Sequence, residues 1–151
     1  MEAPGRQWHT CAITTPTNVP TTGSRGGASG YRRGMITGLD FIGIPSTDAE
    51  RSRRFYLETL GLRADEGAQF EFWVGETCCA IWEPAKNGFP FAPNPAGTLA
   101  LHVEDIAAAR SELEGRGVQF LGDTFDTGVC HMALFADPDG NGLMLHHRHA
   151  S

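Results

Sequence analysis

The sequence contains an internal repeat, which limits the fold to architectures built from two similar units. Asp48 follows a β-like run and precedes a helix-like stretch that ends at Gly61. Asp105, 57 residues later, has the same place before a second helix-like stretch that ends at Gly117. Each stretch then leads into a new strand-like run, as expected for repeated supersecondary units. The chain therefore predicts two similar modules.

The apolar pattern and the turn residues give the order of elements within each module. An aspartate that can cap a helix, amphipathic residues after it and a closing glycine predict each helix. The expected elements of the first module are a strand at 36–46, a helix at 49–60 and strands at 62–64, 69–74 and 77–82. Those of the second are a strand at 98–103, a helix at 106–114 and strands at 118–121, 129–136 and 143–147, with 123–128 as a loop or as strand ends. Both modules are thus βαβββ, and the proline-rich segment 84–97 is expected to link them.

The last two predicted strands flank a five-residue turn with the sequence Asp-Pro-Asp-Gly-Asn, at 137–141. Pro138 presets φ, whereas Gly140 and Asn141 tolerate positive φ, and the aspartates can bond nearby backbone. This combination predicts a tight β-hairpin.

Composition and charge narrow the class of partner. A hydrophobic content of 40%, with 9 Phe, 3 Trp and 2 Tyr, is enough for a packed interior. Four arginines against one glutamate give residues 1–34 a charge of +3, and the total of −6 leaves −9 for residues 35–151. An acidic domain repels phosphate backbones, so nucleic acid is not an expected partner. A cationic small molecule would be tolerated or attracted.

The ends and the cysteines suggest a cytoplasmic protein. Residues 1–34 are rich in Thr, Pro, Gly and Ser without apolar periodicity, which predicts a disordered N-terminal extension, and Met35 is an alternative start. No apolar run is long enough for a secretory signal or a membrane span, so no membrane association is expected. The cysteines lack a C-x-x-C motif or a regular framework, and reduced, buried thiols are expected at Cys11, Cys78, Cys79 and Cys130.

Taken together, these motifs resemble the vicinal oxygen chelate (VOC) superfamily, which contains glyoxalases, bleomycin-resistance proteins and extradiol dioxygenases. The resemblance covers roughly residues 35–148 and is carried by Asp48, Ser52, Phe55-Tyr56, Leu60-Gly61, Val103-Glu104-Asp105 and the turn Asp137-Pro-Asp-Gly-Asn141. It implies an α+β fold in which two βαβββ modules form curved half-barrel sheets around a cavity. The expected domain is 35–151, with modules at 35–83 and 98–151 and the linker at 84–97. The resemblance also implies a homodimer.

The resemblance places metal ligands at positions that here hold other residues. A ligand, usually His, would lie seven residues before the aspartate that precedes each helix, at Phe41 and Thr98. A carboxylate would lie seven residues after the first aspartate of the turn, at Met144. The fourth ligand would lie in the strand 77–82, near which Glu83 is the available carboxylate. Phe, Thr and Met replace divalent-metal ligands poorly, so no metal is expected at this site.

Histidines offer a second kind of site. His102 has the strand parity of Thr98 and His146 that of Met144, so both are expected to face the cavity. They could form an acid-base pair or, with His131, a relocated metal site, or they could simply bond a ligand or one another. His147 and His149 are expected at the surface. The candidate catalytic residues are thus His102 and His146, and the expected cavity residues are Phe41, Thr98, His102, His131, Met144 and His146.

Three functions remain open. The first is a VOC protein that binds an organic small molecule in an apolar cavity without the usual metal or another cofactor, as the bleomycin-resistance branch sequesters a cationic drug. The second is a VOC lyase, isomerase or dioxygenase that uses a relocated metal or histidine acid-base catalysis. The third is a regulatory or structural module whose cavity is filled by its own side chains. The fold alone does not separate them, because function resides in the site.

Overall fold

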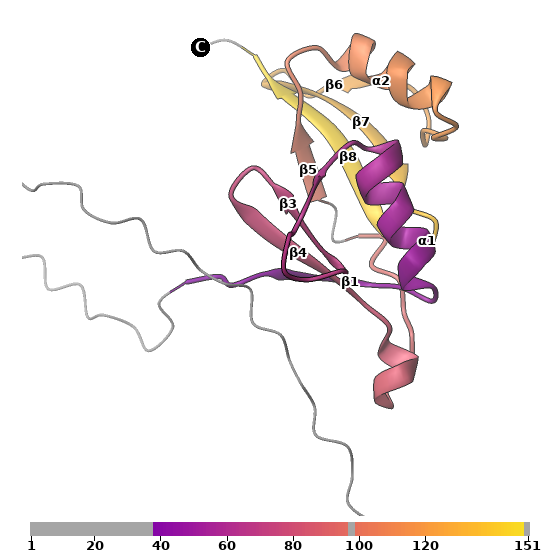
Figure 1. The fold of residues 1–151 in the computed structure, drawn as a ribbon. Coiled ribbons are helices and arrows are strands. Elements are labelled where there is room, and N and C mark those ends of the chain that lie inside the picture. The colour runs from indigo at the N-terminus through magenta and orange to yellow at the C-terminus, as the bar shows by residue number, and fades with distance from the viewer. Residues whose placement is uncertain (1–37, 97–98, 150–151) are drawn as a thin grey trace, which may run out of the picture.

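The computed structural model describes residues 38–96 and 99–149 (Figure 1). The extension expected at residues 1–34 lies outside these residues, as do Cys11 and Thr98. No helix in the described part of the chain has both the length and the apolar character that crossing a membrane requires.

The first module forms one four-stranded sheet, with the strand order β1-β4-β3-β2. Its elements are β1 (Ile42–Pro45), α1 (Ala49–Arg54), the π-helical turn η1 (Phe55–Thr59), β2 (Arg63–Ala64), β3 (Glu71–Val74), β4 (Thr77–Trp82) and the 3₁₀ turn η2 (Pro84–Asn87). Strand β1 is parallel to β4, whereas the other neighbours are antiparallel. The module is therefore βαβββ, as the sequence pattern predicts.

The second module repeats this topology in a sheet with the order β5-β8-β7-β6. Its elements are β5 (Leu99–His102), α2 (Ile106–Gly115), β6 (Phe125–Asp126), β7 (Cys130–Ala136) and β8 (Gly142–Arg148). Here β5 is parallel to β8 and the remaining neighbours are antiparallel. The predicted α+β fold of two βαβββ modules is confirmed.

Local chemistry sets the helix ends as predicted. The Asp48 carboxylate accepts a 3.0 Å hydrogen bond from the backbone N–H of Arg51, and Asp105 accepts one of 2.9 Å from Ala108. These bonds satisfy donors that have no partner within the first turn. After each helix the chain turns through a glycine with positive φ, +71° at Gly61 and +89° at Gly117, which residues with a side chain rarely adopt.

Two predicted elements differ from the structure. The strand expected at 118–121 forms only an isolated bridge between Phe120 and Phe135, and the strand of the ladder is β6 within 123–128. The Val118 N–H bonds to Leu113 O and still closes α2, and only the Leu121 N–H, which bonds Leu134 O, continues the contact with β7. The segment 84–97, expected only to link the modules, contains a regular element: Pro84 starts η2, where its missing N–H leaves no helical bond unmade.

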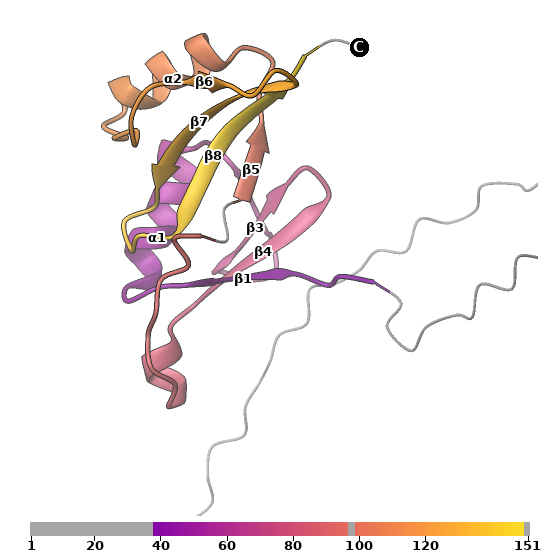
Figure 2. The ribbon, with the colours of Figure 1, turned by 180° about the vertical axis from the view of Figure 1, so that it is seen from behind.

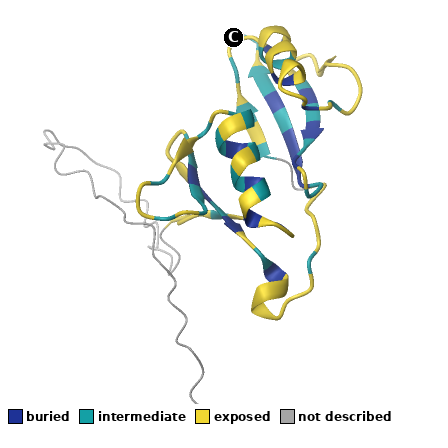
Figure 3. Cartoon of the chain, turned by 45° about the vertical axis from the view of Figure 1, so that its right-hand side comes forward, coloured by how far each residue is buried: buried dark blue, intermediate teal, exposed yellow. Residues whose placement is uncertain are grey.

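The helices lie on one side of the sheets and share a core between the modules. Helix α1 lies beside β7 and β8 in both opposite views, and α2 lies near the far end of the same sheet (Figures 1 and 2). The buried residues form one cluster drawn from both modules, with Tyr56 and Phe72 from the first and Phe135 and Leu143 from the second. Buried residues accordingly occur in α1 and along β7 and β8 (Figure 3). The modules therefore share one continuous core.

The hairpin predicted at 137–141 locks the two modules together. The Asp139 carboxylate, whose side chain is 1% exposed, accepts hydrogen bonds from Ser46 Oγ at 2.8 Å and Ser52 Oγ at 2.9 Å. It also accepts bonds from Thr47 N and Oγ1 and pairs with Arg51 Nη2 at 2.6 Å. Burial opposes ionisation, but the hydrogen bonds from Thr47, Ser46 and Arg51 outweigh it and hold the pKa of Asp139 well below its usual range. The turn of the second module is thus bonded directly to the start of α1 in the first module.

Candidate functional site

Each sheet has one face packed against helices and a second face turned away from them, which we call the open face. In the second sheet Ala133, Phe135, Leu143 and Leu145 are buried on the helix face. Side chains alternate along a strand and paired residues share a face. The open face of this sheet therefore carries Ala100, His102, Met132, Leu134, Met144 and His146. That of the first sheet carries Gly43, Glu71, Trp73, Cys78, Ala80 and Trp82, with Phe41 in register just before β1.

Aromatic side chains dominate the open face of the first sheet. A Cβ on Gly43 would lie 3.4 Å from Trp82 Nε1, so the absence of a side chain there lets the indole lie across β1. Phe89 from the linker meets Trp82 edge to face, with ring centroids 6.2 Å apart. Phe41 and Phe89 are 50% and 57% exposed, respectively. This edge of the open face presents apolar aromatic surface to solvent, and such surface often marks a binding site.

Trp73, on the same face, is held by two polar contacts. Its Nε1–H donates a 2.8 Å hydrogen bond to Asp65 Oδ2, and the guanidinium of Arg63 lies 5.2 Å from the ring centroid. The hydrogen bonds from Trp73 and the Gly67 backbone lower the pKa of Asp65. Trp73 is therefore presented in a fixed orientation.

Glu71 places a carboxylate within this apolar surface. It lies opposite Ala80 on β4, is half-buried, and accepts a 3.5 Å contact from Cys78 Sγ. Within 38–96 and 99–149 it forms no ion pair. Glu71 is not among the site residues predicted from the sequence, although alternation from Trp73 places it on the same face.

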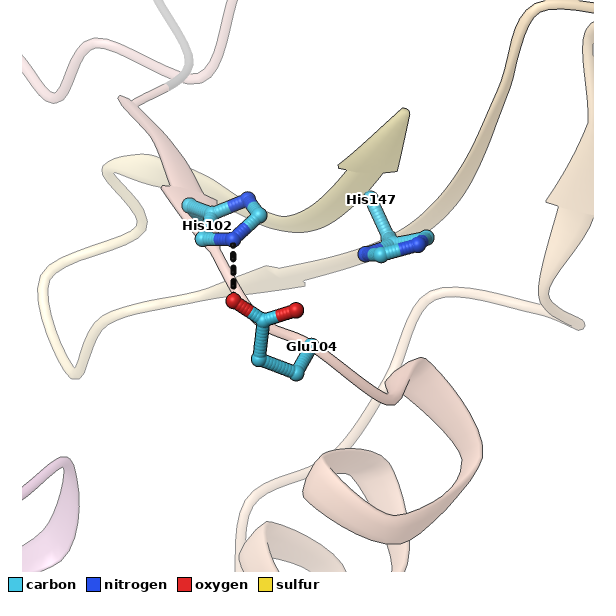
Figure 4. A group of neighbouring side chains, drawn as sticks. All are labelled: His102, Glu104 and His147. Atoms are coloured by element: carbon cyan, nitrogen blue, oxygen red, sulfur yellow. Dashed lines mark hydrogen bonds and ion pairs between the residues drawn. The ribbon is translucent and has the colours of Figure 1, made fainter. Parts of the chain in front are cut away.

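The structure places the candidate histidines on both faces. His102 and His146 are directly opposite each other across β5 and β8, at open-face positions of the ladder. The His102 ring, however, stacks with His147 at a centroid distance of 5.9 Å, and its Nε2 lies 3.2 Å from Glu104 Oε1 (Figure 4). His147 Nδ1 in turn bonds Val103 O at 2.8 Å, and because a carbonyl only accepts, this nitrogen carries the proton.

His131 is not part of the open face. It pairs with Asp126 on β6 and with His147 on β8, so it projects from the opposite side of the second sheet. The three histidines considered as a relocated metal site, His102, His131 and His146, are therefore not brought together on one face.

The comparisons with known proteins agree with this architecture. The sequence profile of the Glyoxalase/Bleomycin resistance protein/Dioxygenase superfamily matches residues 38–145. The chain belongs to this superfamily. No curated protein matches the chain in sequence.

Solved structures of other superfamily proteins share the fold. TnmS3, an antibiotic binding protein from Streptomyces sp. CB03234, is 27% identical with a TM-score of 0.60, and the match covers 76% of this chain and 98% of TnmS3. A glyoxalase/bleomycin resistance protein from the same source is 28% identical with a TM-score of 0.54, over 71% of this chain and 97% of that one. A putative glyoxalase family protein from Bacillus anthracis, at 21% identity and a TM-score of 0.63, covers 78% of this chain and 99% of its own and supports the fold.

The described residues at the superfamily metal positions do not fit a metal ion. Phe41 and Met144 both lie on the open face, at two of the positions where ligands were expected. On β4 the open-face residues are Cys78, Ala80 and Trp82, none of which is a carboxylate. Glu83, the carboxylate considered for the fourth position, instead pairs with Lys86 Nζ at 2.5 Å. A hard or borderline divalent ion would find no adequate ligand set among them.

A small pocket lies where the two modules meet. It has a volume of about 30 Å³ and is lined by β1, Tyr56, Asn94 and the first residues of β5 and β8. That space suits about one water molecule, whereas sites for drug-sized ligands occupy several hundred Å³. This pocket is therefore too small for a drug-sized ligand.

Proposed function

We propose that this superfamily member binds an organic small molecule with aromatic and cationic character on the open face, without using the superfamily metal site. The observation that carries the proposal is the pairing of aromatic surface with Glu71. Trp82 and Trp73 offer ring faces, and the half-buried Glu71 carboxylate offers a counter-charge. Apolar pockets with a few placed polar groups are the usual form of small-molecule sites.

Charge and relatedness support the same class of ligand. Residues 35–151 carry a net charge of −9, which raises the local concentration of cations. TnmS3, at 27% identity, is by its name an antibiotic binding protein. Aromatic side chains also attract cations through their ring faces.

Enclosing such a ligand requires more surface than one chain provides at its pocket of about 30 Å³. A second copy of the chain, placing its own open face over the first, would supply it. The proposed binding form is therefore a homodimer in which two open faces enclose the ligand.

A matched thermal-shift screen tests the proposal. Aromatic amines are compared with their N-acetylated, uncharged counterparts, using untagged full-length protein. Bound ligands raise the unfolding midpoint according to their affinity, so the cationic members should give the larger shifts. Glu71→Gln should remove the difference within each pair, and Trp82→Ala should reduce the affinity for both members by about tenfold or more.

Val129→Ala serves as the matched control. Val129 is an exposed apolar residue that, by alternation from His131, lies on the side of the second sheet opposite the open face. Unchanged binding in Glu71→Gln and Trp82→Ala, with full folding retained, would refute the proposed site. If mass spectrometry shows that a bound compound is converted to a product, and His102→Ala or His146→Ala abolishes this conversion, the protein would instead be an enzyme.

A further inference from the structure

A second group of polar side chains lies at the far edge of the second sheet, away from the open face. Asp126 from β6, His131 from β7 and His149 just after β8 place one ligand-type atom each within 4.8 Å of the others. Two imidazoles and a carboxylate are a ligand set for borderline divalent transition metals such as Zn²⁺. Nothing in the superfamily metal positions corresponds to these residues.

Each imidazole lies near one oxygen of the Asp126 carboxylate, at a distance close to that between neighbouring ligands of a tetrahedral site. His149 Nε2 lies 3.1 Å from Asp126 Oδ1, and His131 Nε2 lies 3.5 Å from Asp126 Oδ2. Zinc bonds of about 2.0–2.1 Å with tetrahedral angles separate neighbouring ligand atoms by about 3.3 Å. Both imidazoles approach the Asp126 carboxylate through their Nε2 atoms. Their ring centroids are 4.6 Å apart. The three ligand atoms thus lie within reach of one ion once the side chains adjust to it.

The backbone holds the three residues in place. Asp126 is paired with His131 in the β6–β7 ladder, and the His149 N–H bonds Val129 O at 3.0 Å. The Gly128 N–H donates a 2.7 Å bond to Asp126 Oδ1, which orients the carboxylate. Outer hydrogen bonds of this type position the ligands of metal sites and contribute to affinity.

One histidine nitrogen of this group has no hydrogen-bond partner. His149 Nε2 is shielded from solvent and has no hydrogen bond, since its 3.1 Å approach to Asp126 lacks the alignment that a hydrogen bond needs. A buried polar atom without a partner costs free energy. A metal ion between the imidazoles and the carboxylate would remove this cost.

Two neighbouring groups provide useful contrasts. The cluster of His102, Glu104 and His147 also brings three ligand atoms within 4.8 Å, but His147 Nδ1 already donates to Val103 O, and Glu104 is 91% exposed (Figure 4). Cys130 precedes His131 and therefore faces the other side of β7, where its Sγ contacts Thr127 Oγ1 at 3.1 Å.

We infer that Asp126, His131 and His149 bind one Zn²⁺ ion, or a similar borderline transition-metal ion, and so tie the β6–β7 hairpin to the chain after β8. Three protein ligands leave one coordination position for water or an added ligand. The site is separate from the open face, so it does not depend on the proposed function.

The test uses untagged full-length protein that has been treated with a chelator and kept reduced. Calorimetric titration with ZnCl₂ should show one binding event, and Mg²⁺ should show none at the same concentrations, because it prefers oxygen ligands. Asp126→Asn and His149→Gln should each weaken zinc binding by about tenfold or more. His102→Gln and Cys130→Ser should leave the affinity unchanged.

Imidazole NMR of the wild-type chain gives a readout that does not depend on any variant. Zinc should shift the ring nitrogens of His131 and His149 and leave that of His146 in place. The inference is overturned if wild type takes up no zinc, or if zinc binding persists in both Asp126→Asn and His149→Gln. Loss of binding in His102→Gln or Cys130→Ser instead would assign the ion to other residues and equally overturn it.

Discussion

The phenol of Tyr56 donates a 2.7 Å hydrogen bond to Oδ2 of Asp137, a residue 81 positions later in the chain. Both side chains are buried, and the Tyr56 ring stacks on Phe72 with centroids 4.5 Å apart. Burial, reinforced by the negative Asp137, raises the pKa of Tyr56 above its ordinary value, so the phenol remains a donor at every physiological pH. One residue of η1 thus packs on its own sheet and bonds the hairpin of the other module.

We expect Tyr56→Phe to destabilise the protein by about 1–3 kcal/mol, because it removes one donor from a buried carboxylate while keeping the ring. Urea denaturation at pH 7 measures the change. Asp137→Asn and the double variant complete a thermodynamic cycle, and a coupling energy near zero would contradict a direct role for this bond.

Much of the fold follows from short stretches whose chemistry is local. The caps at Asp48 and Asp105 and the turn at 137–141 each depend on a few neighbouring residues, and all three form as predicted. The repeat could be predicted because both modules use the same local signals. The prediction of a strand at 118–121 was wrong, because strand pairing depends on where the chain returns to the sheet. The local sequence pattern does not contain that information.

The candidate site was less predictable, because strand parity stops being informative where a strand ends. His102 is the last residue of β5, and its ring turns to His147, which was expected at the surface, rather than to His146. The grouping of Asp126 with His131 and His149 depends on β6, which lies in the segment 123–128 that the sequence left open as a loop or as strand ends. Only tertiary structure brings such residues together.

Asp139 should make the free energy of unfolding depend on pH in the acidic range. Its pKa is held below the ordinary value in the folded chain, so its contribution is fully present above the unfolded pKa of about 3.9 and is lost as the pH falls through the folded pKa. Asp139→Asn should cost about 2–4 kcal/mol at pH 7 and should flatten the loss of stability below pH about 4. Urea denaturation between pH 7 and 2.5 measures both effects.

Asp123→Asn provides the control for this series, since Asp123 is an exposed loop carboxylate. An acid dependence that is identical in wild type and Asp139→Asn would show that the buried carboxylate is not responsible.

The two helix caps should contribute similar amounts, because the two modules use the same bond. Asp48→Ala and Asp105→Ala each remove an acceptor for an N–H in the first helical turn and should destabilise by about 1 kcal/mol. Asp105→Asn should retain most of the stability, since asparagine caps nearly as well as aspartate. Chemical denaturation followed by circular dichroism tests this, and equal losses in Asp105→Ala and Asp105→Asn would point to charge rather than capping.

The thiols in the described part of the chain should be unreactive in the native protein. Cys79 is 1% exposed on the helix face of the first sheet, and burial raises its pKa to about 11. Only about one thiol in a thousand would then be ionised at pH 8, and the thiolate is the reactive form. We expect iodoacetamide at pH 8 to leave Cys79 unmodified in the native chain and to alkylate it rapidly in urea. Peptide mapping by mass spectrometry separates Cys79 from Cys78, and native alkylation of Cys79 at the rate of free cysteine would mean that the first sheet opens readily around it.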